Sequence, residues 1–317
     1  MKKTFIIIAI SALSIFTSCD KSREDNASPR MIPLTISATI GDSDTKVSYA
    51  LNENVLETAW ENGDQLSVIS VNGSGQILHN DIFSTTGSGK TATFTGSITD
   101  DANTYQLYVY YPALTATYEG KPCSPADNDY VDYGVLYEFS DVYSHYRNSY
   151  FLQTALDSPS HLKHYTVLFG QADLAETKKG TLDVTLAHET AVIKVDFTLP
   201  VSNETVYYMD LTGSSLFTGS GWGWINTMGP VNGDNNINIC FGSNVTSGKG
   251  TGLTVSGTTA TAYLPIHVED RTLAAGATLE TYVRGENGTY SVTKTLSADW
   301  TPVAGKMYRM SVTLAAE

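Results

Sequence analysis

Apolar and polar residues alternate along much of this chain with a period of two. The first clear case is the stretch 31–40, in which Leu34, Ile36, Ala38 and Ile40 alternate with threonine and serine. Successive side chains of a β-strand point to opposite faces, so this stretch predicts a strand with one apolar and one polar face. No long apolar stripe with the 3.6-residue period of a helix is present. The pattern therefore predicts an all-β protein.

The same alternation recurs in five further stretches, which we also expect to be strands. They are Leu107, Val109 and Tyr111; Leu182, Val184 and Leu186; Ala191, Ile193, Val195, Phe197 and Leu199; Ala260, Ala262, Leu264 and Ile266; and Tyr308, Met310, Val312 and Leu314. Asn287-Gly288 is the clearest hairpin signal, because these residues suit a tight turn between antiparallel strands. Since each strand has one apolar face, the pattern favours β-sandwiches over a parallel sheet that is buried on both faces.

The length of the chain predicts two domains, because about 300 residues exceed the usual size of a single hydrophobic core. The pattern breaks at Asp173–Gly180, a polar stretch that ends in glycine, and alternation starts again at Thr181. We therefore expect one sandwich over residues 31–176 and a second over 177–317. Residues 118–169 show little strand periodicity and are too long for an ordinary connection. We expect an elaborated loop region there, attached to the first sandwich.

The amino terminus has the pattern of an export signal. A basic start and an apolar run to Phe16 precede the small pair Thr17-Ser18, and Cys19 follows directly, as in a bacterial lipobox. We predict a signal peptide over 1–18, lipid attachment at Cys19 and a flexible polar linker over 19–30. Several acyl chains, such as palmitate, would then hold the mature chain on a membrane surface. A signal anchor is the alternative, although its apolar run is shorter than the roughly 20 residues that span a bilayer.

The charge of the chain argues against a nucleic-acid partner. The sequence has 33 acidic and 19 basic residues, and its net charge is −14. Binding to phosphates requires clustered lysine and arginine. After Cys19 only Cys123 and Cys240 remain, without a CxxC pair, so neither a disulfide framework nor a zinc site is indicated. A single bridge between these two cysteines stays open.

The sequence contains no set of residues that marks a catalytic, metal or cofactor site. Gly87–Thr91 resembles part of a phosphate loop but lacks the first glycine, and His188-Glu189 lacks the second histidine of a zinc protease. His161 and His164 have no evident third ligand, and we expect both to be solvated loop residues. Catalysis would require acid, base or nucleophile gathered in one cleft. We therefore expect no enzyme activity, no metal and no cofactor.

Four short motifs follow one another along the chain. They are Trp60-Glu-Asn-Gly-Asp64, Phe94-Thr-Gly-Ser-Ile98, Leu186–Val195 and Trp300–Tyr308. In this order, behind a lipoprotein signal, they resemble those of the fimbrillin-like proteins, which are subunits and accessory proteins of the fimbriae of Bacteroides-type bacteria. The resemblance implies two tandem transthyretin-like Greek-key β-sandwich domains. It also implies a lipid-anchored location on the outer membrane and in fimbriae at the cell surface, with other fimbrial subunits as partners.

The motifs also have a structural interpretation that requires no chemistry. Asn62-Gly63 suits a turn, and Trp60 supplies a large apolar side chain at the edge of the sandwich. His188 stands just before an apolar strand, where a single histidine is usually a structural residue. We interpret all of these residues as structural.

The resemblance further implies assembly by strand exchange, in which a subunit loses its first strand and accepts a strand from the next subunit. Here the stretch 31–40 is the candidate exchangeable strand, expected at the edge of its sheet, with Leu34, Ile36, Ala38 and Ile40 filling the groove. A missing strand exposes both unpaired backbone groups and apolar pockets, and a partner strand satisfies the two together.

Release of that strand requires a cut between it and the rest of the chain. Major subunits of the family carry an arginine at this place, whereas this chain has Lys46, and Arg30 precedes the strand. Lys46 is therefore the candidate processing site for a trypsin-like protease. Whether the cut occurs, and whether the subunit is a stalk, tip or anchor component, stays open.

A surface glycan-binding lipoprotein is the alternative function. Sugar rings stack on exposed aromatic side chains, and Trp222 and Trp224 would point the same way on an extended segment. Burial of both under a neighbouring loop is the structural alternative. An adhesin at a fimbrial tip, with a host or glycan ligand, would combine the two functions.

Overall fold

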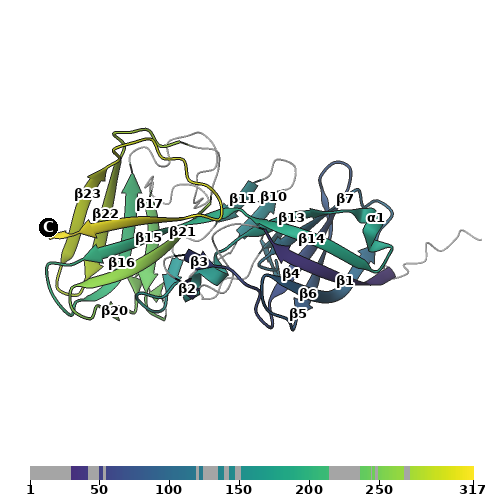
Figure 1. Ribbon diagram of the computed structural model, residues 1–317, viewed down its shortest axis with the longest axis horizontal. Helices are drawn as coiled ribbons and strands as arrows, with labels where there is room; N and C mark the ends of the chain where they lie inside the picture. Colours follow the sequence, from purple (N-terminus) through teal and green to yellow (C-terminus); the bar gives the residue numbers. More distant parts are fainter. Residues whose placement is uncertain are drawn as a thin grey trace, which may run out of the picture.

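The computed structural model describes residues 30–41, 50–52, 55–118, 121–123, 135–138, 143–146, 151–213, 236–243, 245–246, 249–267 and 272–317. Apart from a short 3₁₀ helix, η1 (Ser160–His164), and a single helical turn, α1 (Leu174–Thr177), the regular structure of these residues is β. The prediction of an all-β protein is thus confirmed. Figure 1 shows the strands gathered in two lobes along the long axis. Within these residues we find no helix of sufficient length and apolar character to cross a lipid bilayer.

The first lobe is a closed barrel with the strand order β1-β14-β13-β7-β4-β5-β6 (Figure 1). Its strands are β1 (Arg30–Ile40), β4 (Gln65–Val71), β5 (Ile77–Thr85), β6 (Thr91–Asp100), β7 (Gln106–Tyr111), β13 (Leu168–Ala172) and β14 (Thr181–His188). The apolar row of each strand faces the interior, as the period of two predicts, and Val68, Phe83, Phe94 and Val109 are fully buried there. The sandwich that we expected in this part of the chain is therefore closed into a barrel.

The strand β14 belongs to this barrel, and the predicted domain boundary is wrong. It pairs in parallel with β1 and antiparallel with β13, and Val184 and Leu186 lie in the barrel core. The polar stretch before β14 is a connection within the barrel. Asp173 caps α1, and Gly180, with a φ of 77°, leads the chain into β14. Apart from β12, the strands of the second lobe follow His188, and none of them begins at residue 177.

The second lobe is a two-layer sandwich. Its larger sheet has the order β12-β17-β16-β22-β23-β25, with β20 beside β16, and its smaller sheet has the order β21-β15-β24. The strands are β12 (Phe151–Gln153), β15 (Thr190–Thr198), β16 (Thr205–Gly213), β17 (Asn236–Phe241), β20 (Leu253–Thr254), β21 (Thr259–His267), β22 (Thr278–Gly285), β23 (Thr289–Thr295), β24 (Met307–Thr313) and β25 (Ala315–Ala316). Val195 and Phe197 of the smaller sheet share one apolar core with Met209 and Leu211 of the larger sheet.

The region that we expected to be a long loop, residues 118–169, contains regular structure. Strands β8 (Ala116–Tyr118), β9 (Lys121–Cys123), β10 (Val135–Glu138) and β11 (Tyr143–Tyr146) form a sheet in the order β11-β10-β9-β8. Two short pairs lie elsewhere in the chain, β2 (Ala50–Asn52) with β3 (Val55–Glu57) and β18 (Val245–Thr246) with β19 (Lys249–Gly250). The region is not attached to the first lobe alone, because β12 pairs in parallel with β17 of the second lobe.

The segment from β12 to η1 caps the outer edge of β21. Gln153 Oε1 accepts a hydrogen bond from the Tyr263 N–H, and Gln153 Nε2 donates to the Thr261 carbonyl, each at 3.0 Å. Asp157 Oδ1 accepts from the Thr261 N–H at 2.8 Å, and His161 Nε2 donates to the Tyr263 carbonyl at 2.8 Å. An open strand edge is a template for pairing with another chain, and these side chains take the place of a neighbouring strand. His161 is buried, so its predicted position in a solvated loop is wrong.

The hairpin predicted at Asn287-Gly288 is confirmed. Strands β22 and β23 pair antiparallel up to Arg284 opposite Thr289. Glu204, which is buried, accepts hydrogen bonds from the backbone N–H and the side-chain Nδ2 of Asn287, at 2.7 and 2.9 Å. A carboxylate from outside the hairpin therefore fixes its turn.

Candidate functional site

The first strand, β1, is held on both sides. It pairs antiparallel with β6 from Arg30 to Thr39 and parallel with β14 from Thr35 to Ile40. The predicted position at a sheet edge is therefore wrong. This second neighbour has no local signal in the sequence, because β14 lies far along the chain, beyond the predicted domain boundary. Removal of β1 would open the barrel into a groove with two unpaired edges, one from β6 and one from β14.

The four predicted groove-filling side chains all point into the barrel. Leu34, Ile36, Ala38 and Ile40 are at most 2% exposed, and they belong to the apolar cluster inside the barrel. Burial of a large aliphatic side chain contributes about 1.5–3 kcal/mol. The polar residues between these positions, such as Thr35 and Ser37, are only partly buried. The apolar row of β1 thus fills the barrel core, whereas its polar row lies outside that core.

Trp60 fixes β1 through a hydrogen bond that the sequence did not indicate. Its indole Nε1 donates to the Ala38 carbonyl at 2.9 Å. The ring makes edge contacts with Phe94 at 5.0 Å and Tyr111 at 5.3 Å between ring centroids, and it is 1% exposed. The structural interpretation of Trp60 therefore holds, but its place is inside the barrel beside β1 and not at a sandwich edge. Both the apolar ring and its one polar atom are satisfied there.

The turn after Trp60 sets the position of the indole ring. Trp60 pairs with Gly89 through two backbone hydrogen bonds, and Gly63 has a φ of 95°. Asp64 Oδ2 accepts a hydrogen bond from the Glu61 N–H at 2.7 Å and closes the turn. Burial raises the pKa of Asp64 against the lowering effect of that hydrogen bond. The Asp64 carboxylate thus has a turn-forming role, which agrees with the interpretation from the sequence.

The remaining predicted site residues are outside the described part of the chain. These are Cys19 with the signal peptide and linker, the processing candidate Lys46, and the aromatic pair Trp222 and Trp224. The stretch that contains Lys46 connects Gly41, at the end of β1, to Ala50, at the start of β2. A cut there would separate β1 from the body of the protein.

Two titratable residues, the buried His188 and the half-buried Glu189, lie between the lobes at the junction of β14 and β15. Burial lowers the pKa of His188 to about 4 and raises the pKa of Glu189 to about 7. The Glu189 N–H donates to the Val167 carbonyl at 2.9 Å. His188 is part of the barrel wall, opposite Leu168, which fits a structural role. Among the described residues no three histidine, cysteine, aspartate or glutamate side chains are grouped closely enough to hold a metal ion.

Comparison with known proteins finds no matching family model and no matching curated protein. Solved structures do match. One is a candidate cell adhesion protein from Bacteroides ovatus, with a TM-score of 0.41, 14% identity, and coverage of 91% of this chain and 96% of that chain. A second is a candidate cell adhesion protein from Bacteroides uniformis, with a TM-score of 0.40, 12% identity, and coverage of 90% and 96%.

The fimbrial anchor protein Mfa2 from Porphyromonas gingivalis also matches, with a TM-score of 0.32, 14% identity, and coverage of 78% of this chain and 77% of that chain. These structural neighbours are cell adhesion and fimbrial proteins, the same group that the sequence motifs resemble.

Proposed function

We propose that this chain is a subunit of a cell-surface fimbria or a related adhesive assembly, a member of the fimbrillin-like family that is exported as a lipoprotein and assembled by strand exchange. The observation that carries the proposal is the position of β1, which closes the barrel between β6 and β14 with four buried side chains. The order of the motifs along the sequence supports the family, and with it two transthyretin-like domains.

The two kinds of contact that β1 makes support the proposal of strand exchange. Its backbone pairs with β6 and β14, and its apolar row fills the barrel. A groove left by β1 would therefore accept another strand only if that strand offers both backbone pairing and apolar residues at alternate positions. While β1 is in place, the barrel has no such opening. An intact chain is then complete by itself, and assembly depends on the release of β1.

The order of residues along the chain couples release to the membrane anchor. Cys19 precedes β1, and Lys46 follows it. A cut after Lys46 leaves β1 on the lipid-bearing fragment. The body of the protein is then no longer covalently joined to the lipid or to β1. It also changes β1 from a tethered strand into a separate molecule, so a strand from another subunit competes with it on equal terms. A chain that is cut would join a stalk or tip, and a chain that stays intact would remain an anchor.

The test is limited cleavage of the purified lipid-free chain with a trypsin-like protease, followed by electrophoresis in SDS without boiling. We expect the chain nicked near Lys46 to form a ladder of oligomers, because the opened barrel accepts a strand from a neighbour. Lys46→Gln is the matched control and should stay monomeric under the same treatment. A chain that is nicked at Lys46, loses β1 and still remains monomeric would contradict assembly by strand exchange.

A further inference from the structure

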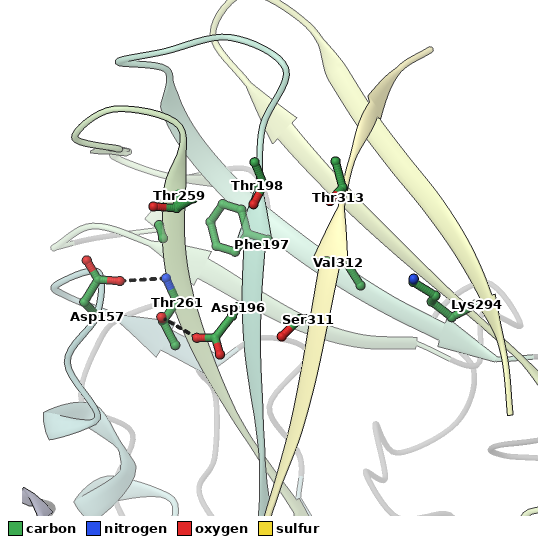
Figure 2. A pocket seen from close by; sticks show the side chains of 11 residues that line it. Asp157, Asp196, Phe197, Thr198, Thr259, Thr261, Lys294, Ser311, Val312 and Thr313 are labelled. Carbon is green, nitrogen blue, oxygen red and sulfur yellow. Dashed lines mark hydrogen bonds between the residues drawn. The ribbon is translucent and has the colours of Figure 1, made fainter. Parts of the chain in front are cut away.

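The outward face of the smaller sheet of the second lobe is covered at one end and open at the other. Near the start of β15, η1 lies on it, and Leu162, Val192 and Tyr263 form a small buried cluster. Toward the far end of β15 the face carries a hollow of about 470 Å³, shown in Figure 2. Sites for small molecules usually measure about 300–1,000 Å³.

Two rows of polar residues cross the three strands in this hollow. The first row is Thr259, Thr198 and Thr313, and the second is Thr261, Asp196 and Ser311. Neighbouring strands of a sheet lie about 4.8 Å apart, so residues directly opposite one another bring their side chains close together. Adjacent hydroxyl and carboxylate groups at this spacing form a nearly flat surface that offers both hydrogen-bond donors and acceptors. Of these six residues, Thr261 is the least accessible, with 9% of its surface exposed, and the other five are half-buried or exposed.

The two carboxylates of the hollow are held in place by one threonine. Asp157 Oδ1 accepts from the Thr261 N–H, and Asp196 Oδ1 accepts from the Thr261 hydroxyl, both at 2.8 Å. Figure 2 shows these two bonds and the second oxygen of Asp157 pointing away from Thr261. Asp157 also donates its own N–H to the Thr261 carbonyl. The carboxylates are thus fixed by one oxygen each, and the other oxygen of each remains to accept a hydrogen bond from a ligand.

The charges in the hollow compensate one another. Lys194 Nζ lies 3.3 Å from Asp196 Oδ1, and Lys294 of β23 lines the hollow from the other sheet. Two carboxylates and two ammonium groups leave no strong field of either sign, so neither a polyanion nor a polycation is favoured. A ligand with many hydroxyl groups and no charge matches such a surface, because each hydroxyl both donates and accepts.

We propose that this polar hollow, formed by the two rows with Asp157 and Lys294, binds a neutral saccharide. The site uses other residues than Trp222 and Trp224, and it is independent of strand exchange because β1 takes no part in it. Ligand binding would then be a property of the second lobe, whereas assembly is a property of the first.

The test is a titration of the isotope-labelled lipid-free chain, followed by two-dimensional amide spectra. The probes are cellohexaose, maltohexaose, xylohexaose, mannohexaose and chitohexaose, each added up to about 1 mM, which detects dissociation constants in the millimolar range. We expect at least one of them to shift the amide signals of Thr198, Thr261 and Ser311 and to leave those of the barrel unchanged.

The double variant Thr198→Val/Thr313→Val removes two hydroxyls without a change of shape, and we expect it to weaken binding about tenfold or more. Thr293→Val, an exposed threonine on β23, is the matched control and should bind as the unaltered chain does. Unchanged spectra outside the hollow would show that both variants are folded. The proposal is overturned if none of the five saccharides shifts these signals, or if the shifts persist in the double variant.

Discussion

The two lobes complete their sheets with different parts of the chain. The barrel is closed by β1, a terminal strand that is joined to the rest only through the stretch after Gly41. The smaller sheet of the second lobe has its β21 edge covered by Gln153, Asp157 and His161, which belong to an internal segment. A terminal strand can leave after one cut, whereas an internal segment cannot. If the proposed strand exchange occurs, the strand that one cut can release lies in the first lobe, and the second lobe keeps its covering segment.

The largest expected effect comes from a charge in the apolar row of β1. Ile36→Asp buries a carboxylate in the middle of the barrel core, and we expect it to lower the free energy of unfolding of the barrel by more than about 4 kcal/mol. Hydrogen exchange measured by mass spectrometry should show lost protection in β4 and β7 and retained protection in β16 and β22. Thr35→Asp, on the polar row opposite Thr95 and Thr181, is the control and should change little. Equal loss of protection in both lobes would show that the second lobe depends on β1 as much as the barrel does.

The next effect concerns the capped edge of the second lobe. Gln153→Ala removes three hydrogen bonds, two to β21 and one to the Ala155 carbonyl, and we expect a loss of about 2–4 kcal/mol. The amides of Thr261 and Tyr263 should exchange faster with solvent while those of β1 do not change. Gln65→Ala is a control, since this exposed glutamine bonds only to Ser84 at the barrel surface. If the amides of β21 stay protected, the side chain of Gln153 does not replace a strand.

A smaller effect is expected for the hydrogen bond between Trp60 and β1. Trp60→Phe keeps an aromatic ring but leaves the buried Ala38 carbonyl without its donor, which costs about 2–3 kcal/mol together with the smaller ring volume. Denaturant unfolding monitored for the barrel should show the loss. The same change at Trp300→Phe serves as a control in the second lobe and should leave the barrel unaffected. A barrel of unchanged stability in Trp60→Phe would mean that the indole N–H does not hold β1.

The smallest effect is a pH dependence at the junction between the lobes. Glu189 has a folded-state pKa of about 7, above its ordinary value of 4.5, so the folded chain keeps a proton that the unfolded chain has released. Stability should therefore fall as pH rises from about 4.5 to 7. His188 has a folded-state pKa of about 4, below its ordinary value of 6.5, and acts in the opposite direction. Its contribution to stability is lost as pH falls from about 6.5 to 4.

The variant Glu189→Gln removes the pH dependence that Glu189 causes and leaves the one that His188 causes. Its thermal midpoint should rise with pH between about 4 and 6.5 more steeply than that of the unaltered chain. Compared with the unaltered chain, its free energy of unfolding should increase by about 1–2 kcal/mol more at pH 7 than at pH 4.5. The measurement is calorimetry across this range. If the thermal midpoints of the two proteins changed in parallel with pH, the raised pKa of Glu189 would be contradicted.

The sequence predicts what depends on neighbours in the chain and misses what depends on distant partners. The strands β1, β15 and β21 and the hairpin at Asn287-Gly288 are visible because alternation and turn chemistry are local. The parallel pairing of β1 with β14 has no local signal, and the polar stretch before β14 therefore suggests a domain boundary that the structure does not have. Polarity and glycine mark a turn, but they do not tell whether the next strand returns to the same sheet.

The candidate site was predicted in part for the same reason. The inward row Leu34, Ile36, Ala38 and Ile40 follows from the period of two, and all four are buried. The bond from Trp60 to Ala38 is not visible, since an aromatic residue before a turn has many possible partners. The side chains that cap β21 are also invisible, because Asp157 and Gln153 lie 104 and 110 residues from the β21 residues whose N–H groups they accept.

The central claim is that β1 completes the barrel and that another strand of the same pattern can replace it. The direct measurement uses a chain that lacks residues 30–41, refolded with or without a synthetic peptide of that sequence, and follows hydrogen exchange at the Trp60 indole N–H. The peptide should restore slow exchange, and the same peptide with Ile36→Asp should not. An indole N–H that is protected without any peptide, or that stays unprotected with the intact peptide, would contradict the account.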